Sequence, residues 1–455
     1  MSPSLLLLSV ALSASVLELD ELLRSIERFP SIIAASEERR AAGGETMAAR
    51  GAFDPVLKSR AIFDVVGYYK NQVFDVSIEA PTPLWGTTLI AGYRAGLGDF
   101  PVYDGKLATN SAGEVRAAVQ IPLLRNGPID RRRANIQRAE LGEKIAGEGL
   151  RLSRLELERA AVVRYWEWVA AGYRLRVAEQ LLALAEARQG QVQARVKAGD
   201  IPDIERVENE RALRQREAQI VAAQRALEQT AIELSVFLRD ERGESMQPDR
   251  GRLPLRLDEP TKHATNLAEA VADSWQLRPE RRRLQLMDRQ NQIELRLAKN
   301  QLLPGLDVFG LVSQDLGGGE KVRAKPEFEL GVTLDLALLF RNARGRVQAA
   351  DAMAARTRAQ LQLIDRRLEA EVRDVLSALS AGHQRLALVR KELELARALA
   401  KAELERFELG DSTLLMVNLR EQAAAEAAVR EVDLLAELQR TEAQLRLTRG
   451  RTLAD

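Results

Sequence analysis

The residues of this 455-residue sequence that could do acid–base or nucleophilic chemistry do not stand in a catalytic pattern. The absence of cysteine excludes thiol chemistry and a cysteine-built metal site. The two histidines, His263 and His383, lie in unrelated contexts, and we interpret His383, inside a long helical stretch, as a solvated surface residue. The sequence contains no Gly-rich phosphate loop and no nucleophile elbow. We therefore predict no enzyme, no metal site and no cofactor.

The composition favours long helices over compact catalytic domains. Aromatic residues make up 4% of the chain and charged residues 29%, a profile typical of coiled coils and long helices. The 67 basic and 66 acidic residues leave a net charge of +1, so we predict no nucleic-acid partner. The charges are interleaved, as they are on solvated helix faces where opposite charges stand four residues apart.

A Gly-Asp pair with informative spacing occurs twice. Gly199-Asp200 and Gly410-Asp411 each interrupt a long helical stretch, and the two glycines lie 211 residues apart. The same offset relates other positions in the two stretches: Arg195 to Arg406, Arg174 to Arg385, Glu210 to Glu421, and Leu234 to Leu445. We infer an internal duplication, in which each copy has the same helix stop.

The elements that position these pairs are unusually long helices. Residues 126–199 contain one proline near the N-terminal end, Pro128, and as a single helix they would extend roughly 100 Å. A return arm follows the Gly-Asp pair, and the pattern recurs in residues 343–409 and 412–448. Helices of this length have no globular core to lie on, so they must pack against other helices. We assign residues 125–239 and 341–449 to two long helical hairpins; a plain coiled-coil stalk is the alternative.

Alternating segments precede both long helices. Residues 115–123 and 328–336 alternate with period two, which predicts strands with one apolar face. The polar residues of the second segment include Glu329, Thr333 and Asp335. We assign residues 53–124 to a first β-hairpin region and residues 302–340 to a second β-hairpin. Residues 53–124 hold more strand-like pieces than one hairpin needs, and the sequence does not place their turns.

Two interpretations of the strands are open at this point. They could form a small sheet that packs on helices in a soluble protein. They could instead contribute to a transmembrane β-barrel, with apolar residues toward lipid and polar ones toward a wet lumen. Two hairpins make four strands, too few to close a barrel, and an open sheet edge does not survive in lipid. The second interpretation therefore requires several copies, and three would give 12 strands.

The remaining segments complete the predicted organisation. Residues 1–15 form a short apolar core with a small-residue cleavage site, which predicts a signal peptide although the usual preceding Lys or Arg is absent. No other stretch is apolar for 18 residues or more, so we predict no transmembrane helix. Residues 16–52 form an N-terminal helix interrupted at Pro30, residues 240–301 a linker with further helices, and residues 450–455 a tail.

With these residues in place, the chain resembles the TolC family of outer-membrane efflux and secretion channels. The resemblance covers essentially the whole mature chain. Its marks, in chain order, are LELDELLRSIERFPSI, FDPVL, QIPLLRNGPIDRRRANIQRAE, ARVKAGDIPDIERVENERA and ERFELGDSTLLMVNLREQA. The order and duplication of these motifs are specific, whereas each one alone is not.

The resemblance implies a mainly α fold with a β-barrel portion. Three copies would form a 12-stranded outer-membrane barrel, in contact with lipid, that continues into a periplasmic α-helical tunnel. It also implies the exit duct of a tripartite efflux or type I secretion system, in which a periplasmic adaptor and an inner-membrane pump engage the far end of the tunnel. The cargo stays open among drugs, metal ions and polypeptides.

The resemblance also assigns roles to residues. The helix turns would be the adaptor-docking tips: Arg195, Gly199, Asp200, Arg406, Gly410 and Asp411. The polar strand residues Glu329, Thr333 and Asp335 would face the barrel lumen. The family often places acidic residues after the second glycine, but Met416 and Leu419 stand there, and Glu205 is the candidate at the tunnel entrance. An alternative from another class is a periplasmic adaptor or other coiled-coil interaction protein, although an adaptor would carry one helical hairpin rather than two.

Overall fold

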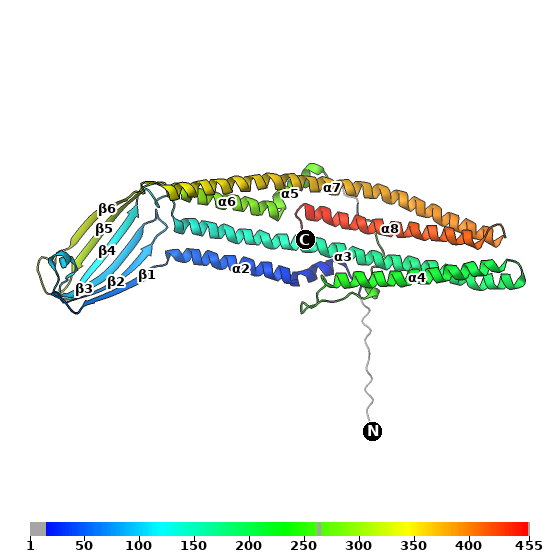
Figure 1. Cartoon of the computed structure of the whole chain (residues 1–455), viewed down its shortest axis with the longest axis horizontal. Helices are drawn as coiled ribbons and strands as arrows, with labels where there is room; N and C mark the ends of the chain where they lie inside the picture. The colour runs from blue at the N-terminus through cyan, green and yellow to red at the C-terminus, as the bar shows by residue number, and fades with distance from the viewer. Residues whose placement is uncertain (1–14, 262–264, 454–455) are drawn as a thin grey trace, which may run out of the picture. The chain divides into compact units, whose positions relative to one another are not determined.

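The structure, a computed structural model, describes residues 15–261 and 265–453 (Figure 1). Apart from Ser15, the predicted signal peptide lies outside the described residues, as does His263. The described chain divides into two compact units. The helical unit comprises the chain up to Ala35, Gly149–Glu280, and Ile364 to the C-terminus; the sheet unit comprises Ser36–Glu148 and Arg281–Leu363.

Eight α-helices lie within the described residues. They are α1 (Leu19–Ser25), α2 (Pro30–Arg50), α3 (Arg131–Ala198), α4 (Asp203–Ser235), α5 (Leu267–Leu277), α6 (Pro279–Asn300), α7 (Arg341–Glu408) and α8 (Leu414–Thr448). The helices α3 and α7 each have 68 residues, and their return arms α4 and α8 have 33 and 35. This correspondence supports the inferred duplication. None of the helices described is long and apolar enough to cross a membrane.

The sheet unit contains one antiparallel sheet whose six strands are ordered as in the sequence. They are β1 (Val56–Asp64), β2 (Asn71–Pro81), β3 (Thr88–Gly98), β4 (Glu114–Pro122), β5 (Gly305–Asp315) and β6 (Glu327–Asp335). The prediction of four strands per chain is therefore wrong, and the 12-stranded barrel of three copies stays a prediction. Residues 53–124 form four strands, which make two hairpins instead of one: β1 pairs with β2, and β3 pairs with β4. The two hairpins are joined because β2 and β3 pair along their full lengths.

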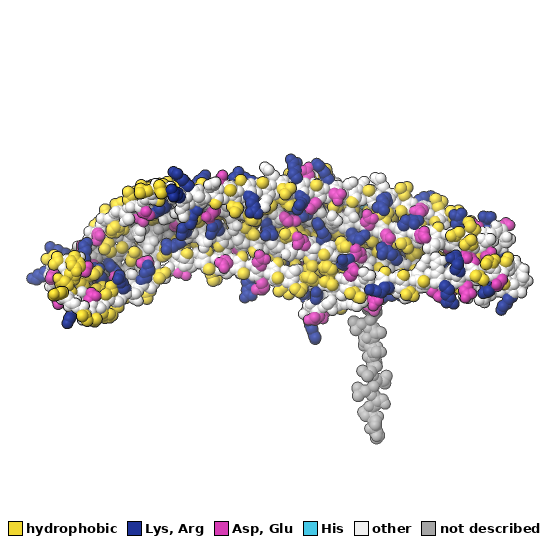
Figure 2. Space-filling model, viewed as in Figure 1, with side chains coloured by type: hydrophobic (Ala, Val, Ile, Leu, Met, Phe, Trp, Pro, Cys, Tyr) yellow, Lys and Arg dark blue, Asp and Glu magenta, His cyan; other side chains and the backbone are white. Residues whose placement is uncertain are grey.

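The strand register gives the sheet two chemically different faces. Leu330, Gly310, Val119, Leu89 and Ala80 stand in one row across five strands, all on one side. The remaining alternate positions extend this apolar face through β1, where Leu57 opposes Ile78. The other side, the polar face, carries the charged residues of the strands. In Figure 2, apolar side chains gather over β6 at the upper edge of the sheet.

The core of the helical unit forms around α3. Trp168 is fully buried in a cluster that joins α1, α3, α4, α8 and Leu453 near the C-terminus. The hydroxyl of Tyr165 donates a hydrogen bond to the carbonyl oxygen of Leu17 at 2.9 Å, and burial raises the pKa of this phenol. The break at Pro30 occurs as predicted, since α2 begins at this residue after a 3-10 turn over Ile26–Arg28.

Candidate functional site

The two Gly-Asp helix turns have the same backbone geometry. Gly199 and Gly410 have φ values of 79° and 86°, the left-handed conformation expected of a glycine that ends a helix. The amide of Asp200 donates to the carbonyl of Arg195, and that of Asp411 to the carbonyl of Arg406, both at 2.9 Å. These bonds, with those from the glycine amides, satisfy carbonyl groups that a helix end otherwise leaves unpaired.

The two turns are open to solvent, but the arginines beside them make different contacts. A Cβ atom on Gly199 or Gly410 would meet open space. Arg195 and Arg406, which the duplication aligns, do not make equivalent contacts. The guanidinium of Arg195 lies 5.4 Å from the ring centroid of Phe407, whereas Arg406 donates to the carbonyl of Asp411 at 3.1 Å.

A small groove lies between α3 and α7 beside the turns. Its volume is about 210 Å³, and its lining residues include Val192, Arg195, Leu404 and Phe407. Phe407, Val192, Leu414 and Val417 form a buried cluster that joins both hairpins. The groove was not predicted from the sequence, although Phe407 stands three residues before Gly410 and is the one aromatic residue near either turn.

Glu205 lies between the two hairpins. Its carboxylate accepts a hydrogen bond of 2.9 Å from the amide of Leu414, the first residue of α8. A carboxylate at a helix N-terminus satisfies an unpaired amide and is favoured by the helix dipole. In this structure Glu205 therefore caps the helix that follows the other turn, and its role at a tunnel entrance stays a prediction.

Above the turns, a buried ionic cluster joins α3, α4 and α8. The carboxylate of Glu421 accepts from both Arg188 and Arg216, and all three side chains are at most 7% exposed. Asn418 accepts weakly from both arginines and donates to Glu208 at 3.3 Å. These residues were not predicted, because a charge on an Ala-rich helix usually indicates a solvated face.

Glu208 connects this cluster to the surface of α4. A side-chain hydrogen bond from Arg211 lowers the pKa of Glu208, against the opposing effect of burial, and the bond from Asn418 lowers it further. Arg211 donates two hydrogen bonds to this carboxylate, at 2.7 and 3.0 Å. The carboxylate therefore remains ionised at neutral pH and holds the Asn418 amide in one orientation.

Ion pairs between strands occupy the polar face of the sheet. Arg94 pairs with Glu114 at 2.6 Å, Arg116 pairs with Asp75, and Lys58 pairs with Glu79 at 2.5 Å. Glu329, Thr333 and Asp335 also lie on this face, in line with the strand pairing. Asp335 pairs with Arg125, and Glu329 lies 3.7 Å from Lys106.

The connection between β3 and β4 folds over the polar face. It includes a 3-10 helix, η3 (Val102–Leu107), and a Cβ on Gly96 of β3 would lie 1.8 Å from the carbonyl oxygen of Leu107. Such close approach requires glycine at this position. Arg94 donates to the carbonyl of Lys106 at 2.8 Å, and Lys106 in turn reaches Glu329 of β6. The loop thus spans from β3 to β6 above the charged residues.

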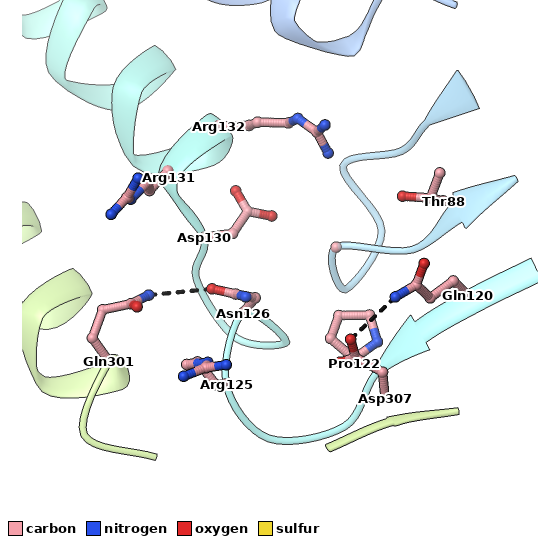
Figure 3. Close-up of a pocket in the computed structure, with 11 residues that line it drawn as sticks. Thr88, Gln120, Pro122, Arg125, Asn126, Asp130, Arg131, Arg132, Gln301 and Asp307 are labelled. Atoms are coloured by element: carbon pink, nitrogen blue, oxygen red, sulfur yellow. Dashed lines mark hydrogen bonds between the residues drawn. The ribbon is translucent and has the colours of Figure 1, made fainter. Parts of the chain in front are cut away.

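The junction between β4 and α3 contains Arg125 and Asn126, which line a polar pocket of about 440 Å³ (Figure 3). Asn126 has a φ of 69°, its amide donates to the Asn300 side chain at 2.8 Å, and its own side-chain oxygen accepts from Gln301. Gln120 donates to Asp307 between β4 and β5. The contacts of Asn126 connect this turn to the end of α6, and the bond from Gln120 connects β4 to β5 on the polar face, so Asn126 has a structural role here.

The described residues contain no group of His, Cys, Asp or Glu placed to hold a metal ion. His383 contacts the Glu259 carboxylate at 3.0 Å and is partly buried, so it is less solvated than predicted.

No protein-family model matches the sequence, and no curated protein matches it by sequence. Solved structures do match. The MtrE outer-membrane channel of Neisseria gonorrhoeae superposes with a TM-score of 0.68 at 16% identity, covering 96% of this chain and 89% of that one. The outer-membrane channel OprN gives 0.66 at 16% identity, with coverage of 96% and 91%. The outer-membrane protein VceC of Vibrio cholerae gives 0.66 at 14% identity, with coverage of 95% and 96%.

These matches define the class of fold. The chain has the fold of the outer-membrane channels of the TolC family, as its motifs predicted, over almost its whole length. The matches cover 95–96% of this chain and so include both helical hairpins, whereas a periplasmic adaptor was expected to carry one.

Proposed function

We propose that the protein is a non-enzymatic exit duct in the outer membrane, which extends into the periplasm and serves a tripartite efflux or type I secretion system. The observation that carries this proposal is the continuous apolar face of the sheet. Its strands have 9 or 11 residues, the length that spans a bilayer when tilted. In lipid this face needs no protein cover, while the charged face would line an aqueous passage.

The polar face supports passage of solutes rather than their chemical conversion. Glu329, Thr333 and Asp335 would face the lumen, and the ion pairs between strands would fix charges along its wall. Fixed charges in a low-dielectric channel select among permeating solutes by their sign.

The two helix turns are proposed as the docking site for a periplasmic adaptor, which would connect the duct to an inner-membrane pump. Asp200 and Asp411 are exposed at turns of equal backbone geometry. Large apolar side chains near them are exposed as well: Ile204, Leu409, Leu415 and Leu419. A homotrimer would present six such turns, each with an acidic group and apolar neighbours suited to a helical partner.

The first test is location and assembly. The protein should fractionate with the outer membrane and run as a trimer after mild detergent extraction. A monomer in the soluble fraction would contradict the duct.

The second test addresses docking. Single cysteines replacing Asp200 or Asp411 should cross-link to the adaptor's helical hairpin in cells, with no native cysteine to interfere. Arg174→Cys and Arg385→Cys, which lie well before the turns in the aligned helices, are the matched controls. Cross-links from the controls alone would show that the adaptor binds elsewhere.

A further inference from the structure

The sheet has two open edges. Within the part of the chain that the structure describes, β1 is paired with β2 alone and β6 with β5 alone. The outward backbone amides and carbonyls of these strands therefore present a template for another strand. If the apolar face lies in lipid, as the proposed function requires, neither edge is stable without a partner, because lipid offers no hydrogen bonds.

We propose that β1 of one copy pairs with β6 of the next, so that all six strands of each chain enter one barrel wall. Three copies then close a ring of 18 strands instead of the 12 that the resemblance implies. This inference rests on the proposed function and adds to it a wider barrel, built by the second hairpin within residues 53–124.

The strand directions and the two faces permit this pairing. Because neighbouring strands alternate in direction and the number of strands is even, β6 runs antiparallel to the β1 it would join. A register that places Ser59 opposite Leu330, Val332 or Leu334 keeps the apolar side of both strands on the same surface. A shift by one residue would turn the apolar side of one strand into the lumen.

The charges on the two edge strands favour pairing of β1 with β6 over pairing of two β1 strands or of two β6 strands. The polar side of β1 carries Lys58 and Arg60 along its middle, with Asp64 at its end, and the polar side of β6 carries Glu327, Glu329 and Asp335. Pairing two β1 strands would bring like cations together, and pairing two β6 strands would bring carboxylates together. A head-to-tail contact between different edges is also the type that generates closed rings.

The additional hairpin is part of the wall and not an appendage to it. The strands β1 and β2 pair over nine residues and β2 and β3 over eleven, with the same apolar side throughout. The turn between β2 and β3 adjoins the β4–α3 junction, since a Cβ on Gly86 would lie 2.7 Å from the carbonyl oxygen of Asn126. This places the turn at the sheet end where the helices attach, as a spanning hairpin requires.

The diameter of the barrel follows from the number of its strands. At a strand spacing near 4.8 Å and a tilt near 40°, 18 strands give a barrel roughly 35 Å across the backbone, and 12 strands roughly 24 Å. The loop over 99–113, which lies above the polar face, would then occupy part of this wider lumen.

Paired cysteines in the full-length protein test the closure. Ser59→Cys is combined in turn with Leu330→Cys, Val332→Cys and Leu334→Cys, which covers three registers, and oxidised in isolated outer membranes. We expect one of these combinations to give covalent trimers. The matched variant is Ala91→Cys on β3 with the same three partners. It tests a 12-stranded ring in which β1 and β2 lie outside the wall and β3 meets β6.

Each result is decisive. Trimers from the Ser59 set, with none from the Ala91 set, support the 18-stranded ring. Trimers from the Ala91 set overturn it while leaving the duct intact. A protein without inter-copy cross-links that is also monomeric overturns the proposed function itself. Electron microscopy of the detergent-extracted trimer gives an independent measure, and a backbone diameter near 24 Å would likewise refute the inference.

Discussion

At the scale of single residues, backbone conformation matters more than space at the helix turns. Gly199 and Gly410 are exposed and have open space where a side chain would begin, yet their φ values are positive. Any other L-residue adopts this conformation at a cost, because its Cβ crowds the carbonyl oxygen that follows.

We therefore expect Gly199→Ala and Gly410→Ala each to lower the free energy of unfolding by about 1–2 kcal/mol. Gly190→Ala is the matched control, since Gly190 also meets open space but lies inside α3. That substitution should raise stability by up to about 1 kcal/mol, because alanine is the better helix former. Thermal unfolding of the purified protein measures both. Equal effects of the three substitutions would show that the turns are not held in the left-handed conformation.

The buried ionic cluster is a second feature at this scale. Removing Arg216 leaves a buried carboxylate with Arg188 as its remaining cation and frees the carbonyl of Leu181, to which Arg216 donates at 2.7 Å. We expect Arg216→Ala to destabilise the protein by about 3–5 kcal/mol. The exposed pair of Arg214 and Glu217 provides the control, and Arg214→Ala should change stability by less than about 1 kcal/mol. Similar losses in denaturant unfolding would mean that the cluster is hydrated and not buried.

At the scale of elements, the strand alternation decides which substitutions the sheet tolerates. Val332 lies on the apolar face of β6 and Thr333 on the polar face, one residue apart on the same edge strand. Val332→Arg should cost about 2–4 kcal/mol near the middle of a bilayer, whereas Thr333→Arg should be tolerated. Folding into lipid vesicles under increasing denaturant measures the difference. Equal damage at the two positions would show that the faces are assigned wrongly.

The long helices illustrate a different relation between local and tertiary structure. Their ends follow local rules, since both α3 and α7 end one or two residues before a left-handed glycine. The register between the helices is set instead by tertiary contacts, because Glu205 caps α8 and Glu421 pairs with arginines of α3 and α4. The hairpins are therefore connected by polar contacts between residues about 210 apart in the sequence.

At the scale of the whole molecule, the exposed apolar face predicts how the protein is held in the membrane. Four large apolar side chains of β6 (Phe328, Leu330, Val332 and Leu334) are each 65–68% exposed, far more than a water-soluble surface usually gathers in one row. We expect the protein to stay in the membrane pellet after alkaline carbonate and high-salt washing and to require detergent for release. Release by carbonate alone would indicate a peripheral protein held by its charges.

Features that depend on neighbours along the chain could be predicted from the residues alone. Period-two alternation identified the faces of 115–123 and 328–336, and the repeated Gly-Asp pairs identified the ends of α3 and α7. Strand pairing and the burial of charged side chains depend on residues distant in the sequence, so they required the tertiary structure. The β4–β5 pairing joins Glu114 to Asp315, and the four strands of 53–124 became countable once their hydrogen-bonded register was known. The buried Arg188, Arg216 and Glu421 look like solvated helix charges in sequence, because burial is set by the helix that packs opposite and not by the residue itself.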